Sequence, residues 1–170
     1  MRTLILLFSL SLFTFTSFAQ DSDEANVTDK GGWLVEINTG TWATGSTAFS
    51  LFSSDGVTLW SIGAEAGYFV ADDIAIKFGL GYQDADLIDG IFTYKVGAKY
   101  YINGQIPVGV DFTGISTDGN GANWVGIQAG YAWMVTPHVA IEPTLRYNLT
   151  LDEMDADSAF QGLIGFVLFL

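Results

Sequence analysis

Charged side chains of both signs recur at alternating positions inside apolar segments of this chain. Every Lys and Arg beyond Lys30 shares one face of such a segment with carboxylates, and the full set is Glu36, Glu65, Lys77, Lys95, Lys99, Asp111, Glu142 and Arg146. An unpaired charge in a partly dry interior would cost several kcal/mol. The balance of four cations and four anions therefore predicts mutual salt bridges. In particular, Arg146 should reach at least one of Glu36, Glu65, Asp111 and Glu142.

The same face carries many glycines, and they keep a second interpretation open. Gly63, Gly67, Gly79, Gly81, Gly97, Gly126 and Gly130 all fall in phase with the charges. Because glycine has no side chain, these positions could leave room for water and hence for a narrow conductance path. Salt bridges that close the interior remain the favoured hypothesis.

Hydrolytic catalysis has little support in the sequence. A general base, most often His, must lie within reach of a nucleophile or a water molecule. The single histidine, His138, follows Pro137 in an expected turn, and no Ser or acid near it suggests a triad. We therefore expect neither an enzyme nor a cofactor.

Acidic residues gather in two expected loops. Carboxylates at such spacing could supply oxygen ligands to Ca²⁺ or Mg²⁺. The alternative, which we favour, is a solvated rim of mutually repelling charges. The weak metal candidates are Asp84, Asp86, Asp89, Asp152 and Asp155.

The charges lie in segments whose apolar residues recur at every second position, which is typical of strands. In the segment 74–82, for example, Ile76 and Phe78 lie on one face while Lys77 and Gly79 lie on the other. Eight segments are expected to be strands: 33–40, 58–69, 74–82, 91–102, 106–113, 123–134, 139–149 and 159–170. An apolar face opposite a polar one predicts an all-β fold, an eight-stranded antiparallel up-and-down transmembrane β-barrel. Arg in place of Val96, on the apolar face, should then impair assembly far more than Ser in place of Gly97.

The connections between these segments alternate in length. Long polar connections are expected at 41–57, 83–90, 114–122 and 150–158, and tight turns at 71–73, 103–105 and 135–138. In bacterial barrels the short turns face the periplasm and the long loops face outside. Both chain termini should therefore be periplasmic.

Aromatic residues cluster near the ends of the expected strands, at the height where the two membrane interfaces would lie. Trp33, Tyr68, Tyr100 and Trp133 would form the periplasmic girdle, and Trp60, Tyr82, Phe92, Phe112, Tyr147 and Phe160 the outer girdle.

The N-terminus has the pattern of an export signal. Arg2 precedes an apolar run that ends in Ser17-Phe18-Ala19 before Gln20. The expected division is a signal peptide over 1–19, an acidic periplasmic segment over 20–32 and the barrel over 33–170. The chain has no Cys, so disulfides cannot stabilise it, and its net charge of −13 makes nucleic acid an improbable partner.

Three stretches carry a family resemblance: GYFVADDIAIKFGLGY (67–82), VAIEPTLRY (139–147) and GFVLFL (165–170). Together they resemble the small outer-membrane β-barrel proteins of Gram-negative bacteria, of the OmpX, OmpW and OmpA-barrel type. The resemblance implies an outer-membrane location and insertion by the barrel-assembly machinery through the C-terminal strand. It is weak for function, because one small barrel serves many roles.

The expected function is that of a monomeric outer-membrane protein with a structural or surface-interaction role and a closed, charge-paired lumen. Its expected partners are membrane lipid, lipopolysaccharide and an unidentified molecule at the extracellular loops. One alternative is an OmpW-like narrow channel for small solutes or hydrophobic molecules. A second is a secreted lipocalin-like carrier, which would place the aromatic face inside around a ligand and the charged face in water.

Overall fold

The computed structural model describes residues 26–40, 49–54, 57–85, 88–117, 121–152 and 156–170. The expected signal peptide, 1–19, and the first part of the acidic segment lie outside these residues. None of the described segments forms a helix that is long and apolar enough to cross a membrane. The strands found among the described residues are β1 Trp33–Asn38, β2 Ser50–Ser54, β3 Val57–Ala71, β4 Ile74–Ala85, β5 Ile88–Ile102, β6 Ile106–Ser116, β7 Gly121–Gly130, β8 Trp133–Thr136, β9 Val139–Thr150 and β10 Ala159–Phe169.

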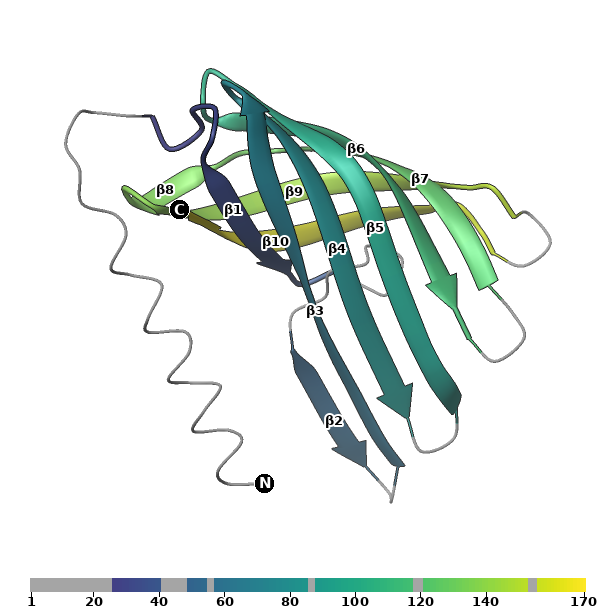
Figure 1. Ribbon diagram of the computed structural model, residues 1–170. Coiled ribbons are helices and arrows are strands. Elements are labelled where there is room, and N and C mark those ends of the chain that lie inside the picture. Colours follow the sequence, from purple (N-terminus) through teal and green to yellow (C-terminus); the bar gives the residue numbers. More distant parts are fainter. Residues whose placement is uncertain (1–25, 41–48, 55–56, 86–87, 118–120, 153–155) are drawn as a thin grey trace.

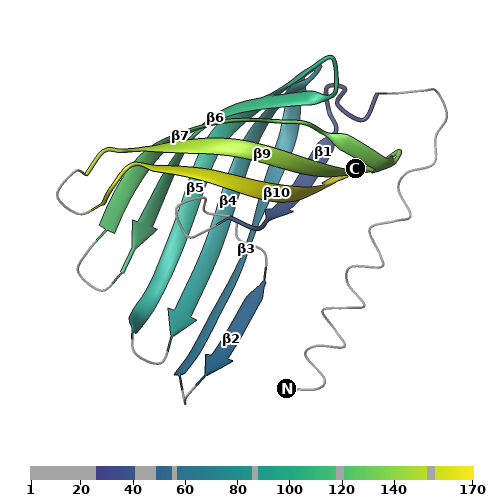
Figure 2. The ribbon, with the colours of Figure 1, turned by 180° about the vertical axis from the view of Figure 1, so that it is seen from behind.

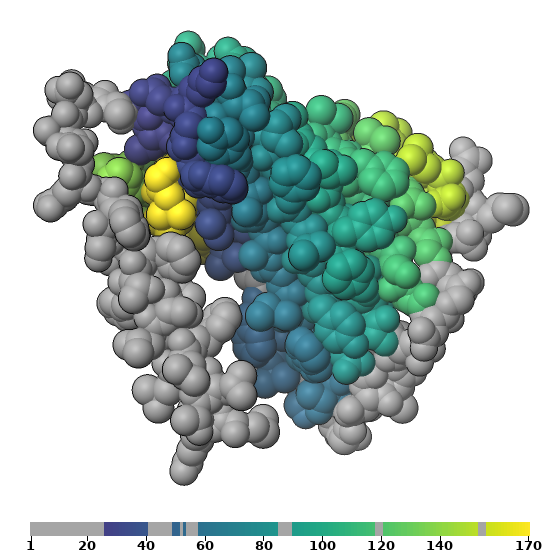
Figure 3. Space-filling model, in the orientation of Figure 1, coloured from purple at the N-terminus to yellow at the C-terminus, as the bar shows by residue number. Residues whose placement is uncertain are grey.

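The sheet closes on itself because β1 pairs with β10 on one side and with β3 on the other. From β10 the order continues through β9, β7, β6, β5 and β4 back to β3, and every pairing is antiparallel. Figures 1 and 2 show the strands inclined around the closed wall. In Figure 3 the purple N-terminal strand lies beside the yellow C-terminal end of the chain. The predicted eight-stranded antiparallel barrel is confirmed.

One short strand and one interruption differ from the sequence-based expectation. β2 lies within the expected loop 41–57 and pairs with the far end of β3; its sequence, SLFSS, lacks a full alternation that could have predicted it. The expected strand 123–134 is divided into β7 and β8 at Tyr131, opposite Pro143. The Tyr131 N–H donates to the Pro143 carbonyl at 3.1 Å, but proline has no N–H with which to complete the pair.

Short turns join the strands at one end of the barrel (Figure 1). At the other end the connections between β6 and β7 and between β9 and β10 are longer, but the expected long loop 83–90 is reduced to two residues between β4 and β5. Asp73 and Asn103 adopt left-handed conformations in the short turns, with φ values of 63° and 52°, which Asp and Asn tolerate better than most residues. At the opposite end, the expected loop 83–90 contributes three residues at each side to β4 and β5. The first and last strands meet at the short-turn end, where the Leu170 N–H donates to the Trp33 carbonyl at 2.8 Å.

Residues 26–32 fold against the short-turn end. The Thr28 hydroxyl donates to the Asp73 carboxylate at 2.5 Å, and the Asp73 N–H donates to the Thr28 carbonyl at 2.8 Å. Val27 packs against the apolar cluster that fills this end of the barrel. The later part of the expected acidic segment 20–32 is therefore attached to the base of the barrel.

Candidate functional site

The candidate site is the lumen, where strand alternation places all eight charged side chains of the sequence-derived set. Glu36 projects from β1, Glu65 from β3, Lys77 from β4, Lys95 and Lys99 from β5, Asp111 from β6, and Glu142 and Arg146 from β9. Each residue is at least nine-tenths buried. Their outward-facing neighbours are apolar, so the polar side of every one of these strands is the inner side.

Glu36 lies at the centre of one chain of ion pairs. Its Oε2 atom is 2.6 Å from Lys77 Nζ and 2.8 Å from Lys99 Nζ. Lys99 also pairs with Glu142, whose other carboxylate oxygen accepts a hydrogen bond of 2.9 Å from the Tyr101 hydroxyl. Both carboxylates are thus held by groups from other strands.

The chain continues from Lys77 to Glu65. Lys77 Nζ is 2.6 Å from Glu65 Oε2, and Lys95 Nζ is 2.6 Å from Glu65 Oε1. Anions and cations therefore alternate without a break, in the order Glu142, Lys99, Glu36, Lys77, Glu65, Lys95. Three carboxylates and three ammonium groups make this chain neutral if all six are ionised.

Arg146 and Asp111 form a second, separate pair. The guanidinium is bidentate, with Nη1 2.5 Å from Oδ2 and Nη2 2.7 Å from Oδ1. The same guanidinium donates from Nε to Asn148 Oδ1 at 2.7 Å and from Nη1 to Gln128 Oε1 at 3.1 Å. The sequence-based expectation that Arg146 reaches one of four named carboxylates is confirmed for Asp111. Bidentate geometry of this kind is the stronger form of an Arg–carboxylate contact.

Two of the inward glycines provide the space that the ion pairs occupy. A Cβ atom at Gly126 would overlap the Arg146 guanidinium, and one at Gly79 would lie 2.9 Å from Glu65 Cγ and 3.3 Å from Lys95 Cβ. The long charged side chains thus occupy the space that glycine leaves free. The interpretation of these two glycines as space for water is therefore wrong.

An aromatic cluster fills the lumen at the short-turn end. Phe69, Tyr101 and Phe169 have ring centroids 5.8 to 6.4 Å apart, and all three are buried with Leu34. Sequence reasoning did not single out these three rings as a group that blocks the lumen. The strand alternation could have predicted their inward direction, because Phe69 follows Glu65 and Tyr101 follows Lys99 at even spacing.

Trp124 is a further buried lumen residue that sequence reasoning did not single out. It is 1% exposed, and its indole N–H donates to the Asp157 carbonyl at 3.2 Å. Beside it, the Asp152 carboxylate accepts hydrogen bonds from the backbone and side-chain amides of Asn123, at 2.8 and 3.0 Å. These contacts attach the β9–β10 connection to β7.

The acidic metal candidates do not form a site within the described part of the chain. Asp152 is engaged by Asn123, and Asp84 lies on β4. Asp86 and Asp155 lie outside the described residues, as does the side chain of Asp89. No group of three or more His, Cys, Asp or Glu residues with metal-binding geometry occurs among the residues that are described.

The ten expected girdle residues all lie on the outer surface. Trp60 is half-buried and the other nine are exposed. Two contacts link neighbours: the rings of Trp33 and Tyr68 are 5.0 Å apart, and those of Trp60 and Tyr82 are 5.5 Å apart. The ten residues are Trp33, Tyr68, Tyr100, Trp133, Trp60, Tyr82, Phe92, Phe112, Tyr147 and Phe160.

The direction of the side chains contradicts the lipocalin-like alternative. A soluble carrier would bury Leu145 and expose Lys77 and Arg146. Instead, Leu145 is 59% exposed, whereas Lys77 and Arg146 are 4% and 1% exposed. The apolar face is the outside of the barrel, so the aromatic residues do not surround an internal ligand.

His138 lies in the exposed turn between β8 and β9, outside the lumen. Its N–H contacts the Thr136 hydroxyl at 3.3 Å, and its carbonyl accepts a hydrogen bond from the Phe169 N–H at 2.8 Å. These contacts involve the backbone of His138 and connect the turn to β10, so they are structural.

Comparison with known structures supports the fold. No sequence family and no curated protein matches the chain. Among solved structures, the N-terminal β-barrel domain of Pseudomonas aeruginosa OprF aligns with a TM-score of 0.55 at 14% identity, over 83% of this chain and 98% of that domain. A de novo designed transmembrane β-barrel aligns at 0.47 and 15% identity, over 84% and 98% of the two chains. Ail, the attachment invasion locus protein of Yersinia pestis, aligns at 0.41 and 11% identity, over 83% and 99%. The chain shares the fold of the OprF β-barrel domain.

Proposed function

We propose that the protein is an integral outer-membrane protein with a structural or surface-interaction role and a closed lumen. The observation that supports this proposal is that side chains fill the cross-section of the lumen. The rings of Phe69, Tyr101 and Phe169 occupy the short-turn end. Above them, the ion pairs join side chains from β1, β3, β4, β5, β6 and β9.

The ion pairs favour a closed lumen over a narrow channel for energetic reasons. A permeating ion or solute would have to separate buried partners, and breaking a buried pair is destabilising by about 3–5 kcal/mol. An eight-stranded barrel is also just wide enough for its own side chains to fill. The inner surface thus acts as a core that holds the wall rigid.

The outer surface supports the membrane location. Apolar side chains such as Phe78, Leu80 and Val110 are 51–61% exposed in the middle of their strands, which a bilayer accommodates and water does not. The likeness in fold to the OprF barrel agrees with this location. The short turns, with Trp33 and Leu170 beside them, would face the periplasm, and the long connections would face the outside.

The proposed partners follow from this placement. Phe166, Leu168 and Leu170 are 41–48% exposed on one face at the C-terminal end, where the barrel-insertion machinery would recognise them. Membrane lipid and lipopolysaccharide would surround the apolar belt, and an extracellular partner would bind the long connections. We propose no catalytic turnover and no cofactor.

Single-channel recording in planar bilayers tests the proposal. Phosphatidylcholine vesicles that contain the protein are fused with the bilayer. The inserted protein should give no steady conductance steps. Insertion is verified independently by the heat-dependent gel mobility of folded barrel recovered from the same vesicles. Steady conductance from verified folded protein would support the narrow channel instead.

A further inference from the structure

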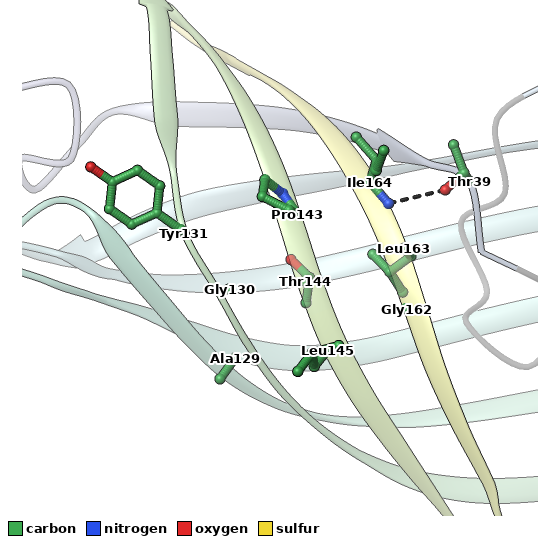
Figure 4. A pocket seen from close by; sticks show the side chains of 10 residues that line it. All are labelled: Thr39, Ala129, Gly130, Tyr131, Pro143, Thr144, Leu145, Gly162, Leu163 and Ile164. Carbon is green, nitrogen blue, oxygen red and sulfur yellow. Dashed lines mark hydrogen bonds between the residues drawn. The ribbon is translucent and has the colours of Figure 1, made fainter.

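A groove crosses the outside of the barrel over β7, β9 and β10. It has a volume of about 620 Å³, and its walls and floor include Ala129, Tyr131, Pro143, Leu145, Gly162 and Ile164. Figure 4 shows these residues on neighbouring strands around the glycine positions. We refer to it as the β7–β10 groove.

The groove results from the sizes of three consecutive rows of outward side chains. In the middle row, Leu145 lies between Ala129 on β7 and Gly162 on β10. On the outer side of this row lie Ile127, Tyr147 and Phe160, and on the short-turn side lie Tyr131, Pro143 and Ile164. The two small residues of the middle row, Ala129 and Gly162, leave space beside Leu145 and between the two rows of larger side chains.

A smaller hollow extends the depression along the seam between β7 and β9. It has a volume of about 270 Å³ and shares Ala129 and Leu145 with the β7–β10 groove, and it reaches Tyr147 and Phe160. Together the two hollows run from Tyr131, near the short-turn end, towards the aromatic residues of the opposite end. An elongated apolar ligand matches this shape better than a compact one.

We propose that the β7–β10 groove binds one acyl chain of a membrane phospholipid as a specific site. The groove is continuous with the apolar belt that the transmembrane fold exposes to lipid, and its walls are largely apolar.

A second copy of the chain fits the groove less well. The commonest dimers have two-fold symmetry, which places the same patch of each copy against the other. Two concave grooves facing each other would leave a void rather than a packed contact, whereas a flexible acyl chain can fill the space. The shape therefore selects lipid as the occupant.

The test uses vesicles of dioleoylphosphatidylcholine and dioleoylphosphatidylethanolamine with a small fraction of phosphatidylcholine that carries a photoactivatable diazirine in its acyl chain. After irradiation, peptide mapping should show labelling concentrated at 129–131, 143–145 and 162–164. Gly162→Leu should reduce this labelling several-fold, because a Cβ at Gly162 has no atom within 4 Å and a larger side chain would enter the groove without a clash. Ala64→Leu, which places a leucine side chain on the exposed face of β3, away from the groove, should leave it unchanged.

The inference rests on the proposed membrane location, and the two can fail separately. Even labelling of the whole apolar belt, or concentrated labelling that Gly162→Leu does not alter, would overturn the acyl-chain site while upholding the membrane location. Absence of labelling anywhere on the belt would overturn both.

Discussion

Glu36 and Glu65 lie directly opposite each other on β1 and β3, and the Lys77 ammonium is 2.6 Å from a carboxylate oxygen of each. Like charges at opposed positions of neighbouring strands destabilise a sheet. Here a cation from β4 lies between them. The β1–β3 pairing that closes the barrel thus depends on a side chain from a third strand.

Replacing Lys77 with Met should therefore destabilise the barrel by about 3–5 kcal/mol, because it leaves two opposed carboxylates without their shared cation. The measurement is equilibrium unfolding in urea from lipid vesicles, followed by tryptophan fluorescence. Lys30→Met provides a control, since Lys30 is exposed and the change should be less than about 1 kcal/mol.

A second variant tests the charge argument itself. Adding Glu36→Gln to Lys77→Met leaves two neutral combinations, Glu142 with Lys99 and Glu65 with Lys95. The double variant should be more stable than Lys77→Met alone. An equal or lower stability would mean that Lys77 acts by packing and not by separating like charges.

Filling the space at Gly126 should destabilise the barrel only when Arg146 is present. A Cβ there overlaps the guanidinium, so Gly126→Ala should destabilise the wild-type barrel by about 1–3 kcal/mol through overpacking. In a background with both Arg146→Ala and Asp111→Ala, the same change should have little effect. Urea unfolding of the four proteins gives the coupling free energy. Gly162→Ala, which enters open space, is the matched control, and additive effects at Gly126 would contradict the packing argument.

Period-two alternation was sufficient to predict the eight strands of the barrel wall and the inward direction of Lys77, because the phase of a strand is a local property. The partners of each charge were not predictable, since they depend on the register between strands, such as Glu36 opposite Glu65. The inward direction of Tyr101 was not predicted, because the adjacent tyrosines Tyr100 and Tyr101 show no alternation of residue type. The division between β7 and β8 depended on Pro143, which lies on a different strand.

A cation on the apolar outer face should destabilise the barrel in lipid. Val96 is 44% exposed in the middle of β5, and Val96→Arg should lower the stability of the barrel in lipid by about 2–4 kcal/mol. Val96→Leu is the control and should fold as the wild type does. The sequence-based choice of Gly97→Ser as a mild comparison is unsuitable, because a Cβ at Gly97 would lie 2.5 Å from the Val110 carbonyl oxygen. Equal folding of the Arg and Leu variants would argue against lipid at this face.

The proposed orientation can be tested by labelling single cysteines in whole cells, because the chain has no Cys of its own. Gln105→Cys lies in a short turn and Asp157→Cys in a long connection, and both native side chains are exposed. On intact Gram-negative cells that express the protein, a membrane-impermeant maleimide should label Asp157→Cys but not Gln105→Cys. Both should react after the outer membrane is permeabilised, which shows that each thiol is accessible. Labelling of Gln105→Cys alone in intact cells would mean that the short turns face outward, the reverse of the proposed topology.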